Sequence, residues 1–323
     1  YNISNNLILY FIRFEVIMEQ PLIDFTSYPL RIALKRLLKD KATKKNIIWA
    51  TNTYEHFGES FDDRAQISEA VFSHGFLLEP RTSKSADTQL ERTRKKAEVY
   101  TPSWVVNFMN NYCDEVWFGR KDVFNIQNGQ TWEPVREKIS FPEGKTWQDY
   151  VDSPRLEISC GEGPYLVSRY DVATSKLIRH TTNRIGILDR KLRIVNENTD
   201  NKEDWIEWAI RAVKASYGYE YQGDSLLIAR INVLLTFVDY YERRWDEDVD
   251  KKILEKLANI ISWNLWQMDG LTDNVPFGAP AGEPDQMSFL EISEVEESEP
   301  VACRIYDWKA NKSQTFISMK EQI

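Results

Sequence analysis

The sequence is poor in cysteine, and its three cysteines lie far apart. Cys113, Cys160 and Cys303 form no CxxC pair. We therefore expect neither a disulfide framework nor a structural zinc site, and we expect a reducing, cytoplasmic location. The three histidines also share no spacing that is typical of metal ligands.

Glycine and proline are scarce as well, with 13 and 12 residues among 323. This excludes a collagen-like or low-complexity chain. No apolar run reaches about 18 residues, so we expect no membrane span. In contrast, apolar residues make up 42% of the chain and aromatic residues 13%. Such a composition indicates a folded protein with a sizeable core, long enough for one large or two ordinary domains.

Positive charge is in deficit overall but is unevenly distributed. The chain has 41 basic and 50 acidic residues, a net charge of −9. However, residues 31–45 hold seven Lys or Arg and one Asp, and residues 81–97 hold six Lys or Arg and two acids. The basic front half could contact DNA phosphates, although solvated helix faces are the simpler explanation for either run.

The two ends of the chain differ in amino-acid composition from the middle. Residues 1–17 (YNISNNLILYFIRFEVI) precede the first methionine, Met18, and we expect them to be a non-native leader. A signal peptide fits poorly, because no basic segment precedes the apolar run. We expect a small, mainly helical region over 18–95 and a second domain over 96–323. The last residues, KANKSQTFISMKEQI, do not resemble a docked terminal element.

Hydrophobic periodicity and turn residues predict an α/β domain with a largely parallel sheet. Residues 155–171 predict a strand, then a glycine turn, then a helix. Residues 119–150 resemble an insertion, and residues 274–299 resemble a loop. The other predicted helices cover 28–39, 65–72, 103–117, 203–214, 223–241 and 250–258. The other predicted strands cover 46–50, 216–220 and the start of 259–271.

The strongest chemical motif is EISCGEGPYL, over residues 157–166. Gly161 and Gly163 would let a ligand approach the backbone where a strand gives way to a helix. A dinucleotide site would also require a third glycine, and Leu166 stands at that position. The motif therefore indicates a nucleotide-like ligand but argues against a nicotinamide cofactor.

Three further features follow a similar logic. Glu220 ends a predicted strand, where it could accept two hydrogen bonds from a ribose diol or be an ordinary exposed acid. Asp269 follows another strand, where it could bind an adenine amino group or be a simple turn residue. Tyr100, Thr101 and Pro102 precede a helix, which Thr101 could cap with Pro102 in its first position.

In this order, the four motifs resemble the adenine-specific (N6) DNA methyltransferases of restriction–modification systems. The matching phrases are EVYTPSWVVNFM, EISCGEGPYL, YGYEYQGDSLLIARINVLLTF and MDGL, and they cover roughly residues 95–271. The chain departs from the family at Glu157, Ile158 and Glu162, where the family usually has Asp, Pro and Ser.

The resemblance implies a Rossmann-like, S-adenosylmethionine-dependent methyltransferase sheet, incomplete here and preceded by the small helical region. The cofactor-binding residues that it implies are Tyr100, Thr101, Pro102, Glu157, Cys160, Gly161, Gly163, Glu220 and Asp269. Among these, Glu220 would hold the ribose hydroxyls and Asp269 the adenine amino group. The others would surround the methionine end of the cofactor. The implied partners are DNA and a restriction endonuclease or specificity subunit.

The chemistry of this family uses an Asn/Asp-Pro-Pro-Tyr/Phe loop that holds a flipped adenine. The sequence contains no such loop, so we name no catalytic residue and expect a fragment that holds the cofactor half. A nuclease motif is also absent from residues 18–95. Two alternatives stay open: a non-catalytic cofactor-binding or interaction subunit that a partner chain completes, and an unrelated nucleotide-dependent α/β enzyme such as a dehydrogenase.

Overall fold

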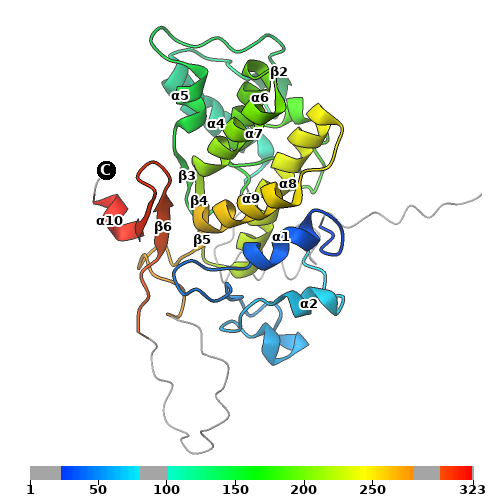
Figure 1. Ribbon diagram of the computed structural model, residues 1–323, viewed down its shortest axis with the longest axis vertical. Helices are drawn as coiled ribbons and strands as arrows, with labels where there is room; N and C mark the ends of the chain where they lie inside the picture. Colours follow the sequence, from blue (N-terminus) through cyan, green and yellow to red (C-terminus); the bar gives the residue numbers. More distant parts are fainter. Residues whose placement is uncertain (1–22, 81–100, 279–298, 322–323) are drawn as a thin grey trace, which may run out of the picture.

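The computed structural model describes residues 23–80, 101–278 and 299–321, which form a mixed α/β structure (Figure 1). The leader, the boundary near residue 95 and Tyr100 lie outside these ranges. The helices are α1 (Leu30–Leu37), α2 (Glu69–Ser73), α4 (Ser103–Phe118), α5 (Trp147–Asp152), α6 (Ile187–Asn198), α7 (Lys202–Lys214), α8 (Gly223–Trp245), α9 (Lys251–Asn264) and α10 (Phe316–Lys320). The strands are β1 (Asn125–Asn128), β2 (Thr131–Pro134), β3 (Arg155–Glu157), β4 (Ser216–Glu220), β5 (Leu265–Gln267), β6 (Arg304–Asp307) and β7 (Lys312–Thr315).

The central feature is a parallel sheet with the strand order β3-β4-β5. Gly218 is the register partner of Glu157 on one side and of Leu265 on the other. Because the three strands are parallel, their carboxyl ends meet at one edge of the sheet. The expected α/β class with a parallel sheet is confirmed at this level.

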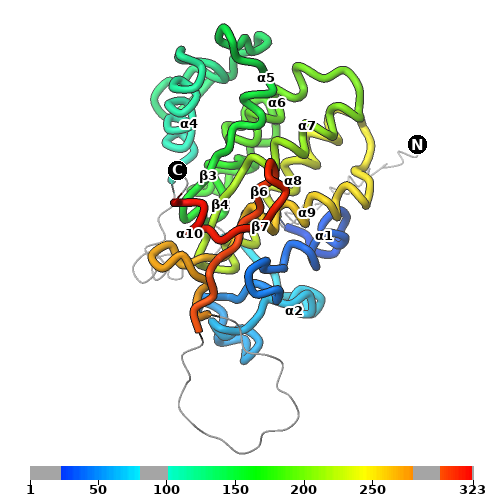
Figure 2. Tube along the Cα trace, turned by 60° about the vertical axis from the view of Figure 1, so that its left-hand side comes forward, coloured from blue at the N-terminus to red at the C-terminus, as the bar shows by residue number. Residues whose placement is uncertain are grey.

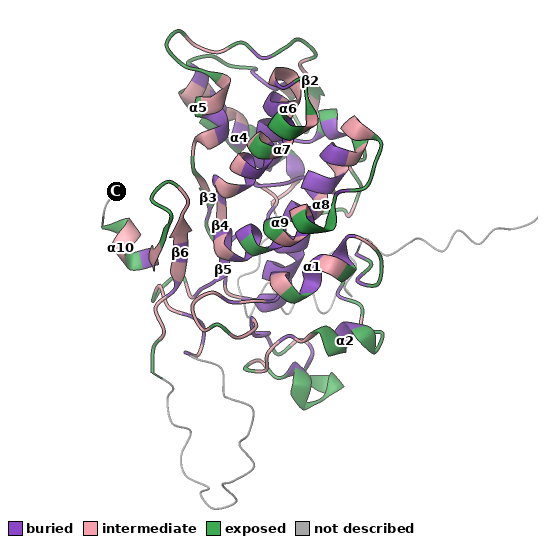
Figure 3. Cartoon of the chain, in the orientation of Figure 1, coloured by how far each residue is buried: buried purple, intermediate pink, exposed green. Residues whose placement is uncertain are grey.

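The two faces of the sheet are covered by different elements. Leu265 belongs to the main core, which α6, α7, α8 and α9 share, and α8 is buried along most of its length (Figure 3). On the other face, Trp266 and Tyr219 lie against Phe316 of α10, with ring centroids 5.3 and 6.0 Å apart. The β6-β7 hairpin completes this second cluster. The expectation that the last residues contain no docked element is therefore wrong.

The helix predicted directly after the glycine turn is also wrong, because residues 164–186 contain no α-helix. Their main chain forms turns and local hydrogen bonds, such as that from Ile178 N–H to the Arg169 carbonyl at 2.8 Å, and it also bonds to the start of α6. The N–H groups of Ile187 and Leu188 donate to the carbonyls of Tyr165 and Leu166, at 2.9 and 2.8 Å. Helix α6, which we did not predict, therefore follows this irregular segment.

Two predicted strands differ from the structure. Residues 46–50 form only isolated bridges, such as that between Ile48 and Gln66, and Ala50 has a left-handed φ of 49°. Residues 259–264 are the last turns of α9, because Ile260 and Ile261 continue its buried face. The strand starts only at Leu265. The prediction for 65–72 is correct only in part, since α2 starts at Glu69.

Residues 23–80 pack directly on the sheet and its helices. Four residues of α1 are buried, and this helix lies along α9 (Figure 2). The buried guanidinium of Arg230, on α8, donates to the carbonyls of Leu37 and Lys39 and also to that of Leu265. One side chain thus links the N-terminal region to β5. Within the described part of the chain, no helix has the length and apolar character that a membrane span requires.

Candidate functional site

The candidate site lies at the carboxyl edge of the parallel sheet. Glu157 is the last residue of β3, Glu220 is the last residue of β4, and Asp269 follows β5 by two residues. The structure places the glycine turn, residues 161–163, next to Glu220. The Gly161 N–H donates to Glu220 Oε2 at 2.8 Å, across 59 residues of sequence.

The glycine turn has a conformation that favours glycine. Gly161 has φ of 52° and Gly163 has φ of 79°. A Cβ atom added to Gly161 would meet no atom within 4 Å, whereas one added to Gly163 would lie 3.5 Å from Ala229 Cβ. At Gly161 it is the positive φ that favours glycine, and one side of the turn there is open. Gly163 packs against α8.

Glu220 is buried and uses its carboxylate to organise the turn. Besides Gly161 N–H, its Oε1 atom accepts the N–H groups of Tyr221 at 2.9 Å and Gln222 at 3.0 Å. Burial raises the pKa of Glu220, and these three backbone donors oppose that rise. A carboxylate has about four acceptor positions, so Oε2 keeps one lone pair with which it could bind a ligand hydroxyl.

Glu157 anchors the segment behind the turn. Its carboxylate accepts the N–H groups of Tyr165 at 3.2 Å and Leu166 at 3.0 Å. Burial raises its pKa to about 8, against the opposing effect of these two donors. The neighbouring Cys160 is a packing residue, since burial raises the pKa of its thiol well above the ordinary value and Gly218 lies beside its Sγ.

Glu162, between the two glycines, is directed into the protein. Tyr170 Oη donates to its carboxylate at 2.7 Å, and Asn232 Nδ2 donates to its carbonyl at 3.1 Å. Sequence reasoning missed this role of Asn232. The signal was present in the phrase ARIN, because Ala229 and Asn232 are three residues apart and so share the α8 face that meets the turn.

Thr101 and Pro102 lie at the start of α4. Pro102 is the N-cap residue rather than the first helical residue, and no side-chain cap comes from Thr101. The predicted capping arrangement is therefore wrong. Asp171 replaces it, accepting the Ser103 N–H at 2.9 Å from the segment that follows the glycine turn. This contact tethers Thr101 and Pro102 to the candidate site.

Asp269 stabilises its own turn. Its Oδ1 atom accepts the Leu271 N–H at 2.9 Å, and its main chain bridges to Asn274. These are the contacts of a turn residue, the simpler of the two roles considered for it. Among the described residues, no group of three His, Cys, Asp or Glu side chains could hold a metal ion.

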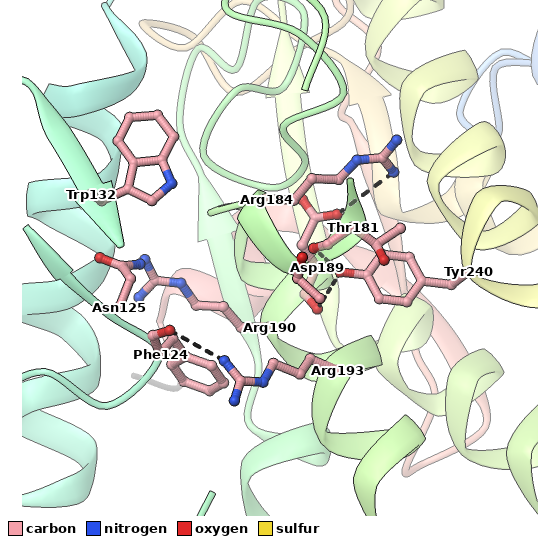
Figure 4. A pocket seen from close by; sticks show the side chains of 10 residues that line it. Phe124, Asn125, Trp132, Thr181, Arg184, Asp189, Arg190, Arg193 and Tyr240 are labelled. Atoms are coloured by element: carbon pink, nitrogen blue, oxygen red, sulfur yellow. Dashed lines mark hydrogen bonds and ion pairs between the residues drawn. The ribbon is translucent and has the colours of Figure 1, made fainter. Parts of the chain in front are cut away.

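A small enclosed cavity lies between α6, α8 and the β1-β2 hairpin (Figure 4). Its volume is about 10 Å³, which is room for about one water molecule. Arg184 Nη1 and Asp189 Oδ1 line it 4.0 Å apart, and neither has a hydrogen-bond partner among the described residues. A bridging water would satisfy both atoms. A cavity of this volume cannot hold a cofactor.

A much larger cavity, of about 1140 Å³, opens where β3 and β4 begin. It lies between α7 and the β6-β7 hairpin, and its lining includes Arg155, Leu156, Tyr217 and Trp308. None of the residues expected to bind the cofactor lines it. This cavity and the site expected from the sequence are therefore different places, and the functional assignment depends on the chemistry at the carboxyl edge.

Comparison with known proteins does not extend this description. No family model matches the chain, and searches of curated proteins and of solved structures find no match either. The functional assignment therefore depends on the motifs and on the geometry of the site.

Proposed function

We propose that the chain carries the S-adenosylmethionine-binding part of a site-specific adenine-N6 DNA methyltransferase of a restriction–modification system. The observation that supports this proposal most strongly is the hydrogen bond from the Gly161 N–H to the Glu220 carboxylate. It joins a glycine turn after one parallel strand to the acid that ends the next strand, where ligands of open α/β sheets bind. A Rossmann-like methyltransferase fold, DNA as substrate and a cytoplasmic location belong to the same proposal.

The residues present fit the cofactor in two respects. Gly161 leaves one side of the turn open to the methionine end, and Glu220 Oε2 keeps an acceptor position for a ribose hydroxyl. Thr101, Pro102, Cys160 and Gly163 would shape the same end. Asp269 would reach the adenine amino group after giving up its own turn contact.

When bound, S-adenosylmethionine supplies the methyl group that the reaction transfers. The chain's own contribution is to bind and orient it, since positioning provides much of the rate in such transfers. The sequence has no Asn/Asp-Pro-Pro-Tyr/Phe loop, so we assign no catalytic residue. A partner chain that supplies this loop would make the protein a cofactor-binding subunit, the alternative considered above. A restriction endonuclease or specificity subunit is a further proposed partner.

The test is calorimetric titration with S-adenosylmethionine, using the unmodified chain and Glu220→Gln. We expect binding to weaken about tenfold or more, because a hydrogen bond to a charged group contributes roughly 1.5–3 kcal/mol. Glu203→Gln, an exposed acid on α7, is the matched control and should bind normally. Circular dichroism would confirm that all three proteins are folded.

A second ligand separates ribose binding from a purely structural role of Glu220. Removing the ribose 2′-hydroxyl from the ligand should weaken binding to the unmodified chain. It should not weaken binding to Glu220→Gln further, because both changes remove the same hydrogen bond. Absence of any binding would refute the proposed function. If the losses of affinity from the variant and from the modified ligand add up, only the role of Glu220 in ribose binding is refuted.

A further inference from the structure

Helix α4 buries an unusual number of polar side chains. Asn107, Asn110 and Asp114 are buried on its inner face, together with the apolar Val106 and Phe118. Asp114 pairs with the buried guanidinium of Arg190, and Asn107 exchanges hydrogen bonds of 2.8 Å with Asn125. A surface helix normally buries its apolar side chains and exposes its polar ones, so the outer face of α4 needs an explanation.

The outer face of α4 is mainly apolar. Phe108, Tyr112 and Val116, each four residues from the next, are 60%, 59% and 69% exposed. Trp104 and Met109 extend the same face, with 36% and 44% exposure. We call these five residues the α4 stripe. Cys113 is exposed as well, and the same face carries one acid, Glu115, whose side chain is 39% exposed and pairs with Lys121.

The position of α4 leaves this stripe uncovered by the described residues. In Figure 2 the helix forms an outer edge of the molecule, beside the upper ends of the other helices. A contiguous exposed apolar patch usually marks an interaction surface. The charged side chain on this face, Glu115, is acidic and pairs with Lys121, so the stripe lacks the positive potential needed for nucleic acid.

A second copy of the chain would provide a matching surface. In the commonest class of helix packing, the ridges formed by residues spaced four apart fit into the grooves of the other helix, and a two-fold axis would pair the stripe with its own copy. The exposed parts of the five side chains amount to roughly 500 Å² on each copy. A symmetric contact that covered all of this surface would bury about 1,000 Å² in total, near the lower limit for specific interfaces.

We propose that the α4 stripe is the interface of a homodimer in which α4 packs against α4 of a second copy about a two-fold axis. The polar inner face supports this role, since the Asp114–Arg190 pair fixes the rotation of the helix and so keeps the apolar side chains outward. The proposal does not require a bound cofactor, although Trp104 lies only two residues from Pro102, at the cofactor end of α4.

Sedimentation velocity of the whole chain over a range of concentrations tests the interface. We expect a dimer for the unmodified chain, and a dissociation constant raised at least 100-fold by Phe108→Glu or Tyr112→Glu. Leu271→Glu is the control, since this side chain is 96% exposed and lies outside α4. It should leave the dimer intact. A monomer at tens of micromolar, or a dimer that both stripe variants retain, would overturn the proposal.

Cross-linking provides a second, geometric test. Cys113 is the exposed cysteine, whereas Cys160 and Cys303 are buried. With a rise of about 1.5 Å per residue and an interaxial distance of about 8–10 Å, the helix axes of such a dimer lie roughly 13 Å apart at the two Cys113 positions. A bismaleimide of that span should join two copies, and Cys113→Ser or Phe108→Glu should abolish the product. Cross-linking that persists in Phe108→Glu would contradict the proposed contact.

Discussion

The two glutamates that end β3 and β4 dominate the electrostatics of the candidate site. Glu157 and Glu220 are both buried, and the partners of both carboxylates among the described residues are backbone N–H groups. Backbone donors stabilise the charged form, but burial outweighs them and raises the pKa of each acid. Each glutamate therefore makes folding depend on pH.

Glu157 makes the folded chain less stable as the pH rises. Its pKa is about 8 in the folded chain and 4.5 in the ordinary case. Below the lower value the carboxyl is protonated in both states. Between the two values the unfolded chain has released its proton and the folded chain retains it, so stability falls as pH rises. The loss is about 1.4 kcal/mol for each pH unit between the two pKa values, and it ends near the higher one.

Urea unfolding between pH 5 and 9 checks this expectation. The free energy of unfolding of the unmodified chain should decline across the window relative to that of Glu157→Gln, which cannot ionise. Parallel profiles for the two proteins would show that Glu157 is already ionised in the folded state and that its two backbone donors outweigh burial.

At the scale of elements, α8 organises most of the molecule. Its first residue, Gly223, donates its N–H to the Trp49 carbonyl at 2.9 Å. Arg230, two turns later, binds carbonyls after α1 and at β5. Ala229 and Asn232, on another face, support the glycine turn. The same helix thus positions the N-terminal segment, the sheet and the candidate site.

The first residue of α8 leads to a prediction about packing. A Cβ atom at Gly223 would lie 1.9 Å from the carbonyl oxygen of Ile48, which is backbone and cannot rotate away. We expect Gly223→Ala to destabilise the fold by roughly 2–3 kcal/mol, the upper range for overpacking. In Gly218→Ala the added atom would meet Cys160 Sγ at 3.2 Å, so that loss should be smaller. Chemical denaturation of both variants would reveal the order, and equal losses would contradict it.

At the scale of the whole molecule, residues 23–80 and the sheet share one hydrophobic core. Trp49 and Leu37 belong to the same cluster as Leu265 and Phe237. Elements that share a core and buried hydrogen bonds unfold together in small domains. The molecule should therefore behave as one cooperative unit.

Calorimetry tests this expectation. We expect one thermal transition, with a van't Hoff enthalpy equal to the calorimetric enthalpy. Fluorescence of the chain's tryptophans, among which Trp49 reports on the N-terminal region, should change at the same temperature. Two transitions would show that the N-terminal region is a separate folding unit.

Much of the element order was accessible from local sequence. The prediction for residues 216–220 coincides with β4, and that for 223–241 lies within α8. Predictions failed where hydrogen-bond partners are distant. The end of residues 155–171 resembles a helix, but the Asp189 carboxylate accepts the Ser168 N–H at 2.9 Å and α6 uses the neighbouring carbonyls. Local periodicity does not contain that information.

The sequence by itself determined the glycine turn and the acids at the strand ends, because a positive φ and a strand terminus are local properties. Only the tertiary structure decided what these residues contact. Glu220 meets Gly161 because two parallel strands lie in register, and α4 turns its polar face inward because Arg190, 76 residues beyond Asp114, buries a charge there. Satisfying a buried charge outweighs covering an apolar face, since an unpaired ion in the core is among the most unfavourable states of a folded chain.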